Sequence, residues 1–436
     1  MAFPASAFLT ELPWQPVETF LPFLTGKQVA FLDSGGDPAQ SRQRWSYLCP
    51  EPTALLKLDQ QEARIFRPVL RQFWQEQKPV HPLATHLPFT GGLIGFASYE
   101  AGMACEHVIS RHKTDVPAFL VMACHDLFIF DRLDRRLWWS STKGHPPPSV
   151  SREDFPHPSP LHFTPDDTEA TWKETVSAVR RFIEAGDIFQ ANLTMRWQAF
   201  RPKETSLSAF YRKLRHACPA PFGAFLATAE FGLLSASVER FLSLSADGLI
   251  ETRPIKGTAP LMADPVHNKR IKDTLSQDEK ELAENLMITD LMRNDLGRVS
   301  EMASVHVPQL CKVEEFAHVH HLVSSVQSRL KADYDVFDLL YATLPPGSVT
   351  GAPKHRAMEI IDQLESSSRG AYCGTLFRIG WNGAMDSSVI IRSLSATTEK
   401  FRLGAGGGIT WPSSPQAEYE EMLLKAAPLL KALGSP

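Results

Sequence analysis

The sequence has little cysteine, and its six cysteines lie far apart in a chain of 436 residues. They are Cys49, Cys105, Cys124, Cys218, Cys311 and Cys373. No CxxC pair and no Cys/His cluster has the spacing of zinc ligands. This excludes a zinc ribbon and a disulfide framework, and it predicts reduced, buried thiols of the kind found in cytoplasmic proteins.

The sequence also lacks an excess of either charge and any long apolar run. Its formal net charge is -4, with no cluster of lysine or arginine, so we expect no nucleic-acid partner. The sequence contains no run of about 18 apolar residues, so it predicts no membrane span. The start, MAFPASAFLTELPW, has no positive leading segment and does not resemble a secretory signal. The sequence therefore predicts a globular protein of the cytoplasm, with 43% hydrophobic residues to form its core.

Several nucleotide-binding and catalytic motifs are missing. The stretch LGAGGGITW has Ile409 where the dinucleotide fingerprint needs a small residue, and PPGSVTGAPK lacks the P-loop spacing. No GxSxG elbow and no glutaminase-type GxCxG occurs. Residues Gly404–Gly406 instead offer either backbone N–H groups that approach an anion closely, or a bulge or tight turn of a sheet.

The composition changes between residues 146 and 165, where seven prolines exclude a helix or a central strand. We interpret residues 146–165 as a connection. It joins an N-terminal part, residues 1–145, to a longer part, residues 166–436, in which we expect the catalytic groups.

Four helices are predicted in the longer part of the chain. They begin at Thr164–Pro165, at the capping box Ser276–Glu279, after Pro353, and at Ser414–Pro415. Short β-type runs, such as 388–393, lie between them without a repeated strand–helix–strand unit. The pattern indicates an α+β fold with antiparallel sheet.

Two of these helices carry carboxylates on one face. Glu281 and Glu284 share a face of one helix, and Glu418, Glu421 and Lys425 share a face of another. A solvated surface is the ordinary explanation for each face alone. The alternative is that the two faces meet around Mg2+, which commonly takes one or two protein carboxylates.

Many segments, in one order, resemble the chorismate-utilising family that contains anthranilate synthase, isochorismate synthase and aminodeoxychorismate synthase. They are GDIFQANL, ETRPIKGT, DEKELAENLMITDLMRNDLGRV, VHHLVSSV, PPGSVTGAPKHRAMEIIDQLE, RGAYCGTL, SVIIRS, GAGGGI and EYEEMLLKA, between residues 186 and 426. The resemblance implies an anthranilate-synthase-like fold, in which antiparallel β-sheets form a sandwich with helices packed outside.

The resemblance further implies chorismate as substrate and Mg2+ as cofactor. At the matching positions, Glu284 and Glu421 are the implied metal ligands, which hold the ring carboxylate through the ion. Arg392 suits a grip on a carboxylate because a guanidinium donates two parallel hydrogen bonds. The implied substrate-binding positions are Gly257, Thr258, Thr350, Gly351, Tyr372, Arg392, Gly404, Ala405, Gly406 and Lys425.

Two positions distinguish the branches of the family. The branch that forms isochorismate and salicylate has a water-activating lysine where this chain has Gln190. Anthranilate synthases have alanine where this chain has Lys256, and lysine there is characteristic of aminodeoxychorismate synthase component I, which acts toward 4-aminobenzoate and folate. The alternative function is that of anthranilate synthase component I. A third possibility is a non-catalytic binding subunit with the same fold.

The resemblance implies catalytic roles for Lys256, Glu239 and His321. The amine of Lys256 would attack C2 of chorismate while the C4 hydroxyl leaves, and ammonia would then displace the lysine by attack at C4. Glu239 matches the general acid and base, although Val238 precedes it where the family usually has proline. A dry pocket is expected to raise the pKa of Glu239. His321 matches a histidine near the leaving hydroxyl, with a satisfied core histidine as the alternative.

The N-terminal segment resembles the part of the family that carries a tryptophan pocket, and ordinary core packing is the alternative explanation. The matching residues are Ser34, Arg42, Gln43, Arg44, Trp45, Pro221, Phe222 and Gly223. Because the glutaminase motif is missing, we expect ammonia to come from solution or from a separate glutaminase subunit.

Overall fold

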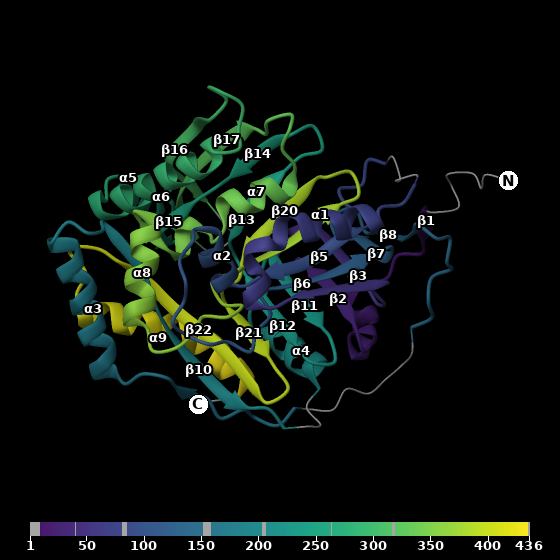
Figure 1. Ribbon diagram of the computed structural model, residues 1–436, viewed down its shortest axis with the longest axis horizontal. Coiled ribbons are helices and arrows are strands. Elements are labelled where there is room, and N and C mark those ends of the chain that lie inside the picture. Colours follow the sequence, from purple (N-terminus) through teal and green to yellow (C-terminus); the bar gives the residue numbers. More distant parts are fainter. Residues whose placement is uncertain are drawn as a thin grey trace.

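Two antiparallel β-sheets form the centre of the molecule, and helices cover their outer faces (Figure 1). The computed structural model describes residues 9–39, 41–80, 85–150, 158–202, 206–262, 264–315 and 319–434, without the side chains of Ser41 and Thr258. None of the helices in these ranges is long and apolar enough to cross a bilayer. All six cysteines are free thiols; four are buried, as the sequence predicts, whereas Cys218 and Cys311 are only partly buried.

The first sheet runs in the order β1-β8-β7-β3-β2-β11-β12-β21-β22-β10-β18, and β9 also pairs with β10. Its strands are β1 (Leu9–Leu12), β8 (Arg136–Ser141), β7 (Asp126–Asp131), β3 (Trp45–Cys49), β2 (Val29–Asp33), β11 (Phe222–Ala227), β12 (Gly232–Ser237), β21 (Ser393–Ala396), β22 (Lys400–Ile409), β10 (Gln190–Phe200), β18 (Gly351–Ala352) and β9 (Thr164–Pro165).

The second sheet runs in the order β15-β17-β14-β13-β20-β19-β5-β6-β4, and β16 also pairs with β17. Its strands are β15 (Ile255–Pro260), β17 (Val319–Arg329), β14 (Leu249–Thr252), β13 (Arg240–Leu244), β20 (Met385–Val389), β19 (Thr375–Gly380), β5 (Gly92–Ala97), β6 (Phe119–Cys124), β4 (Ala54–Leu58) and β16 (His306–Glu315). Strands from before residue 146 pair with strands from after residue 165 in both sheets.

The two sheets pack face to face. One buried apolar cluster contains Tyr47 and Ala224 from the first sheet together with Phe96 and Leu120 from the second. The outer faces are covered by separate sets of helices, whose apolar residues join two larger clusters. The predicted α+β sandwich with helices outside is therefore observed.

The helices on the first sheet are α3 (Glu169–Glu184), α4 (Leu207–Ala217), α8 (Lys354–Leu364) and α9 (Pro415–Leu433). Those on the second sheet are α1 (Phe66–Gln77), α2 (Tyr99–Cys105), α6 (Glu279–Gly297) and α7 (Val336–Thr343). Helix α5 (Pro265–Ser276) contacts β15, β16 and β17. In Figure 1, α5 and α6 lie beside β16 and β17 at the upper left, far from the N-terminal strands at the right.

The predicted starts of two helices were wrong. Helix α3 begins at Glu169, where the side chain of Thr168 accepts a hydrogen bond from the Thr171 N–H. Residues Thr164–Pro165 instead form β9, because they pair with β10. Likewise Ser276 ends α5, and the N-cap of α6 is Asp278. The predicted starts after Pro353 and at Ser414–Pro415 are confirmed.

Candidate active site

The candidate site forms where the chain crosses between the sheets. Glu239 lies in the crossing from β12 to β13, and Arg392 lies in the return crossing from β20 to β21. The Ala236 N–H donates to the Arg392 carbonyl at 3.1 Å, and the Val389 N–H donates to the Glu239 carbonyl at 3.1 Å. These hydrogen bonds hold the two crossings side by side, so the run 388–393 is not the single strand that the sequence predicts.

The Glu239 carboxyl lies among groups from three other elements. Burial raises its pKa, while a hydrogen bond from Ser348 and the charges of Lys256 and Lys425 act in the opposite direction. Ser348 belongs to the short 3₁₀ helix η5 (Gly347–Val349). The net rise agrees with the expectation from the sequence, and it favours the protonated form that a general acid needs.

A β-bulge redirects the chain at Lys256. Lys256 pairs with Leu322 of β17 and Thr258 pairs with His321, so Gly257 is an extra residue in β15. Gly257 has a φ of 76°, in the left-handed region that favours glycine. Bulges next to active sites commonly re-aim a side chain. The Thr258 side chain lies outside the described part of the structure.

The half-buried Lys256 side chain lies among carboxylates rather than on the outer surface. Its positive charge acts to lower the pKa of each of four carboxyl groups from three elements. They are Glu239, Glu281, Glu284 and Glu421. The amine and the predicted general acid are therefore near enough to act on each other electrostatically.

His321 is half-buried beside the same bulge. Its Nδ1 lies 3.3 Å from the Gly257 carbonyl oxygen. Because a carbonyl only accepts, Nδ1 carries the proton, and Nε2 of the neutral ring keeps its lone pair. Burial lowers the pKa of His321; the hydrogen bond to Gly257 opposes this, and the charges of Arg392 and His320 lower it further. The ring is thus held neutral near Arg392.

The carboxylates of α6 and α9 act on one another electrostatically. Burial raises the pKa of Glu284, which is 8% exposed, and the negative charge of Glu418 on the other helix raises it further. Burial also raises the pKa of Glu281, and the negative charge of Glu421 raises it further. The carboxylates of the two helices are therefore near enough to repel one another, although the Glu421 side chain is 51% exposed.

Two hydrogen-bonded side chains fix the α9 face. Lys425 Nζ lies 2.7 Å from Glu421 Oε1 and donates to the Gly406 carbonyl at 3.0 Å. Ser413 Oγ donates to Glu418 Oε1 at 2.6 Å. Burial opposes ionisation of Glu421, but the lysines around it hold its pKa below the usual value.

The donor set fits a magnesium ion held by few protein ligands. In the described ranges, no group of three or more His, Cys, Asp or Glu residues is arranged to hold a metal. Mg2+ commonly takes only one or two carboxylates and completes its shell with water and substrate oxygens. A cation would also offset the mutual repulsion that adds to the effect of burial on the pKa of Glu284, so the residues present fit the ion.

Residues Gly404–Gly406 lie within the regular strand β22, in neither a bulge nor a turn. Strand β22 pairs with β10 along its whole length, whereas β21 covers only Phe401–Leu403. The edge beyond Leu403 is not covered by β21, and the Gly406 carbonyl on that edge accepts from Lys425. Because N–H and C=O of one residue in a strand point to the same side, the Gly406 N–H faces this edge too.

Tyr372 and Ala405 are two other predicted binding positions at this part of β22. The Tyr372 ring lies directly on Gly404, where an added Cβ would come within 2.4 Å of a ring carbon. Ala405 is 4% exposed and belongs to the core under the helices, so only its backbone can serve a ligand.

Thr350 and Gly351 serve the fold of the loop that carries Ser348. The Thr350 hydroxyl donates to the Gly347 carbonyl at 3.1 Å, and the Thr350 carbonyl accepts from the Asn192 N–H at 2.6 Å. Gly351 pairs with Ala191 of β10. Their predicted contact with substrate stays a prediction.

Sequence reasoning missed two groups of this site. Ser348 lies inside a recognised segment, but its hydrogen bond to Glu239 depends on how η5 meets the crossing. Lys280 Nζ lies 3.9 Å from Glu284 Oε1 and acts on Glu421 as well. The spacing of Lys280 and Glu284 by four residues was the available signal.

A cavity of about 210 Å³ exists at the predicted tryptophan-type pocket. Six predicted residues line it: Ser34, Arg42, Trp45, Pro221, Phe222 and Gly223. Gln43 and Arg44 are not part of the lining, and Arg44 forms an ion pair with Asp131 instead. Burial, with Arg240 and Arg253, lowers the pKa of Arg42 to about 10. The ligand of this cavity stays a prediction.

Residues 30–431 match the model of the chorismate binding enzyme family. The chain belongs to this family. This chorismate-binding enzyme is 36% identical to aminodeoxychorismate synthase component 1 of Klebsiella aerogenes, over 99% of this chain and 100% of that protein. It is 37% identical to anthranilate synthase component 1 of Thermus thermophilus, over 79% of this chain and 78% of that protein.

The fold of the chorismate-binding enzyme is also that of a solved relative. Anthranilate synthase component I from Streptococcus pneumoniae superposes with a TM-score of 0.76 at 28% identity, over 89% of this chain and 92% of that one. The predicted family and fold are therefore confirmed.

Proposed function

We propose that this chain is an aminodeoxychorismate synthase component 1, which converts chorismate and ammonia to 4-amino-4-deoxychorismate for 4-aminobenzoate and folate synthesis. The observation that carries the proposal is the position of Lys256, whose positive charge acts on Glu239 and on the carboxylates of α6 and α9. The relative that matches almost the whole chain has this name.

Substrate carboxylates would be held by Arg392, by the Gly406 N–H and by Tyr372. Held by Glu284 and Glu421, Mg2+ would bind the ring carboxylate and draw electron density from the ring. The His321 ring, whose Nδ1 lies 3.3 Å from the Gly257 carbonyl oxygen, would lie near the leaving C4 hydroxyl.

The proposed reaction proceeds in two displacements. In the first, Lys256 Nζ bonds to C2, the ring double bonds shift and the C4–O bond breaks, while Glu239 protonates the leaving hydroxyl to give water. In the second, ammonia bonds to C4, the double bonds shift back, and the bond between C2 and Lys256 breaks. One proton of the attacking ammonia restores the Glu239 carboxyl, so the sum is chorismate plus ammonia to product plus water.

Product analysis tests the proposal. Purified protein with chorismate, Mg2+ and ammonium salt is expected to yield aminodeoxychorismate by mass spectrometry, and Lys256→Ala is expected to lose amination at C4. The exposed Lys27→Ala is a matched control and should behave as wild type. Anthranilate as the product of the wild-type protein would support the alternative, the activity named for the Thermus thermophilus relative. Unchanged chorismate would support a non-catalytic subunit.

We further propose a separate glutaminase subunit as the source of ammonia, in line with the designation component 1 of the relative. With glutamine in place of ammonium salt, turnover is expected only after a second protein is added. Turnover of glutamine by this chain alone would contradict this part of the proposal.

A further inference from the structure

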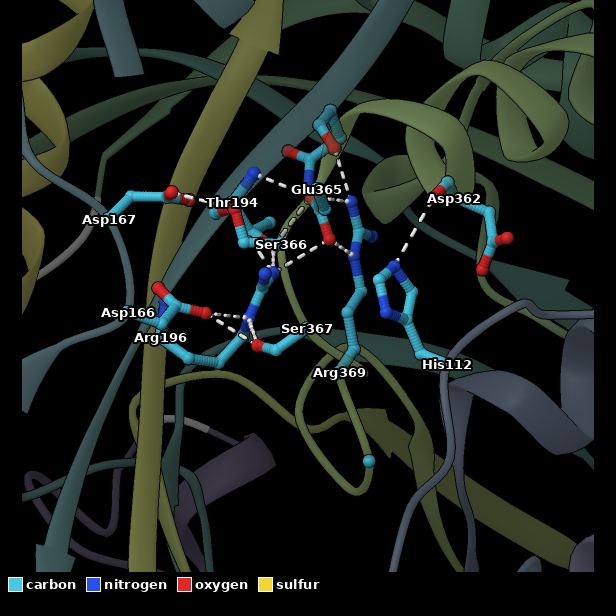
Figure 2. Close-up of polar contacts among 12 residues, drawn as sticks. His112, Asp166, Asp167, Thr194, Arg196, Asp362, Glu365, Ser366, Ser367 and Arg369 are labelled. Atoms are coloured by element: carbon cyan, nitrogen blue, oxygen red, sulfur yellow. Dashed lines mark hydrogen bonds and ion pairs between the residues drawn. The ribbon is translucent and has the colours of Figure 1, made fainter. Parts of the chain in front are cut away.

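A second polar cavity, of about 230 Å³, lies between β10, β22 and the loop after α8, outside the group of residues around Lys256. Its lining consists of His112, Lys113, Asp166, Arg196, Gln198, Ser366, Ser367, Ser368 and Arg402. Figure 2 shows several of these side chains around the Arg196 guanidinium. None of them has a role in the proposed reaction.

Arg196 brings a buried guanidinium, with one nitrogen unpartnered in the described part of the chain, to the lining of this cavity. It is 3% exposed, and its Nε and Nη1 bind Asp166 at 3.1 Å and Glu365 at 2.7 Å. Its Nη2 is buried and has no hydrogen-bond partner among the described residues. A buried donor without a partner is unfavourable, so negative charge placed in the adjacent cavity would be favoured by this guanidinium.

The other groups of the lining are donors with spare capacity. Lys113 and Ser368 make no side-chain hydrogen bond or ion pair within the described ranges, and Arg402 uses one nitrogen for an ion pair with Asp115. Ammonium, guanidinium and hydroxyl groups together suit an oxyanion.

The acidic residue of the lining is already occupied. Asp166 Oδ1 accepts from the Arg196 N–H at 3.0 Å, and Oδ2 accepts from Arg196 Nε at 3.1 Å and from Ser367 Oγ at 2.5 Å (Figure 2). Asp166 is therefore matched within the protein, which disfavours a cation in this cavity.

From these observations we infer that the cavity binds a compact oxyanion of the phosphate class, through Lys113, Arg402 and Ser368, with the Arg196 guanidinium beside them. The anion is either free inorganic phosphate or the phosphate group of a small metabolite. Both sources present the same acceptor oxygens to the same donors.

Isothermal titration with inorganic phosphate, in buffer without Mg2+, tests the site on the full chain. Saturable binding is expected, and Lys113→Met and Ser368→Ala are each expected to weaken it by about tenfold or more. Methyl phosphate serves as the second probe: binding at least as tight as that of phosphate indicates the metabolite source, and weaker binding indicates free phosphate.

Two further variants keep the result specific. Lys27→Met removes an exposed lysine elsewhere and should leave the affinity for phosphate unchanged. Arg392→Gln changes the anion grip proposed for chorismate and should also leave it unchanged, so the outcome does not depend on the proposed function. The inference is overturned if neither probe binds, if Lys113→Met and Ser368→Ala bind as wild type does, or if only Arg392→Gln loses binding.

Discussion

At the scale of single residues, Glu239 depends on its surroundings for its proposed role as an acid. Its pKa is raised by burial, so its protonated form persists to higher pH than that of a free carboxyl. Activity that needs this proton is present below the raised pKa and is lost as the pH rises through it. Glu239→Gln is expected to lower kcat by about 100- to 10,000-fold and to remove this limb of the pH profile.

Ser348→Ala provides the matched control for Glu239. The hydrogen bond from Ser348 lowers the pKa of Glu239, so its removal should raise that pKa and move the falling limb to higher pH. Rate measurements between acidic and alkaline pH check both variants. A Ser348→Ala profile that moves to lower pH would contradict the assignment of the limb to Glu239.

Glu365 is a residue-scale determinant of stability. It is 3% exposed and lies between Arg369 at 2.7 Å and Arg196 at 2.7 Å (Figure 2). Burial opposes its ionisation, yet Arg369 and Arg196 hold its pKa below the usual value. Glu365→Gln leaves two buried guanidinium groups short of a counter-charge and is expected to cost about 3–5 kcal/mol in unfolding free energy.

The Glu365→Gln substitution should also change how the free energy of unfolding depends on pH. Because the folded pKa of Glu365 is lowered, its contribution is present above the unfolded value and is lost as the pH falls through the folded value. Urea unfolding at several pH values should therefore show that the free energy of unfolding falls less at acidic pH in Glu365→Gln than in wild type. The exposed Glu184→Gln should match wild type throughout, and an equal acid loss in all three proteins would contradict the prediction.

At the scale of elements, the bulge in β15 sets the direction of Lys256. Gly257 and Gly248 both have positive φ, 76° and 89°, so alanine at either position is expected to cost about 1–2 kcal/mol. An added Cβ at Gly257 would lie 3.1 Å from Glu281 Oε2, whereas at Gly248 it would meet nothing within 4 Å. We expect similar losses of stability, but a loss of amination only in Gly257→Ala. Equal amination rates in the two variants would show that the bulge does not position Lys256.

Some elements were predictable and others were not, for local reasons. The apolar spacing of α3 is plain in the sequence, and Trp172, Val176 and Val179 are buried. Helix α5 was missed because it buries only Leu275 in its described residues and so has a weak apolar pattern. The misplaced helix starts arose because several residues near each start are suitable caps, and sheet pairing or a preceding helix selected among them.

At the scale of the whole molecule, the chain before residue 146 is part of both sheets. Strand β2 pairs with β11, and β5 pairs with β19. Residues 166–436 made alone would expose long unpaired strand edges and part of the core between the sheets. This fragment is expected to aggregate or to lack a cooperative unfolding transition. Co-expression with residues 1–145 should restore a soluble protein that unfolds cooperatively. Circular dichroism and size-exclusion chromatography would check this, and a stable monomeric 166–436 fragment would contradict it.

The sequence by itself determined which chemical groups are present: a lysine at 256, a carboxyl at 239, paired glutamates at helical spacing and a glycine-rich segment at 404–408. These follow from residue types and short-range periodicity, which act over a few residues. Only the tertiary structure decided that these groups come together, because two crossings between the sheets lie side by side and the carboxylates of α6 and α9 come within electrostatic reach of one another from distant parts of the sequence. Burial and neighbouring charge, which raise the pKa of Glu239 and leave Arg196 Nη2 without a partner, exist only once that packing has formed.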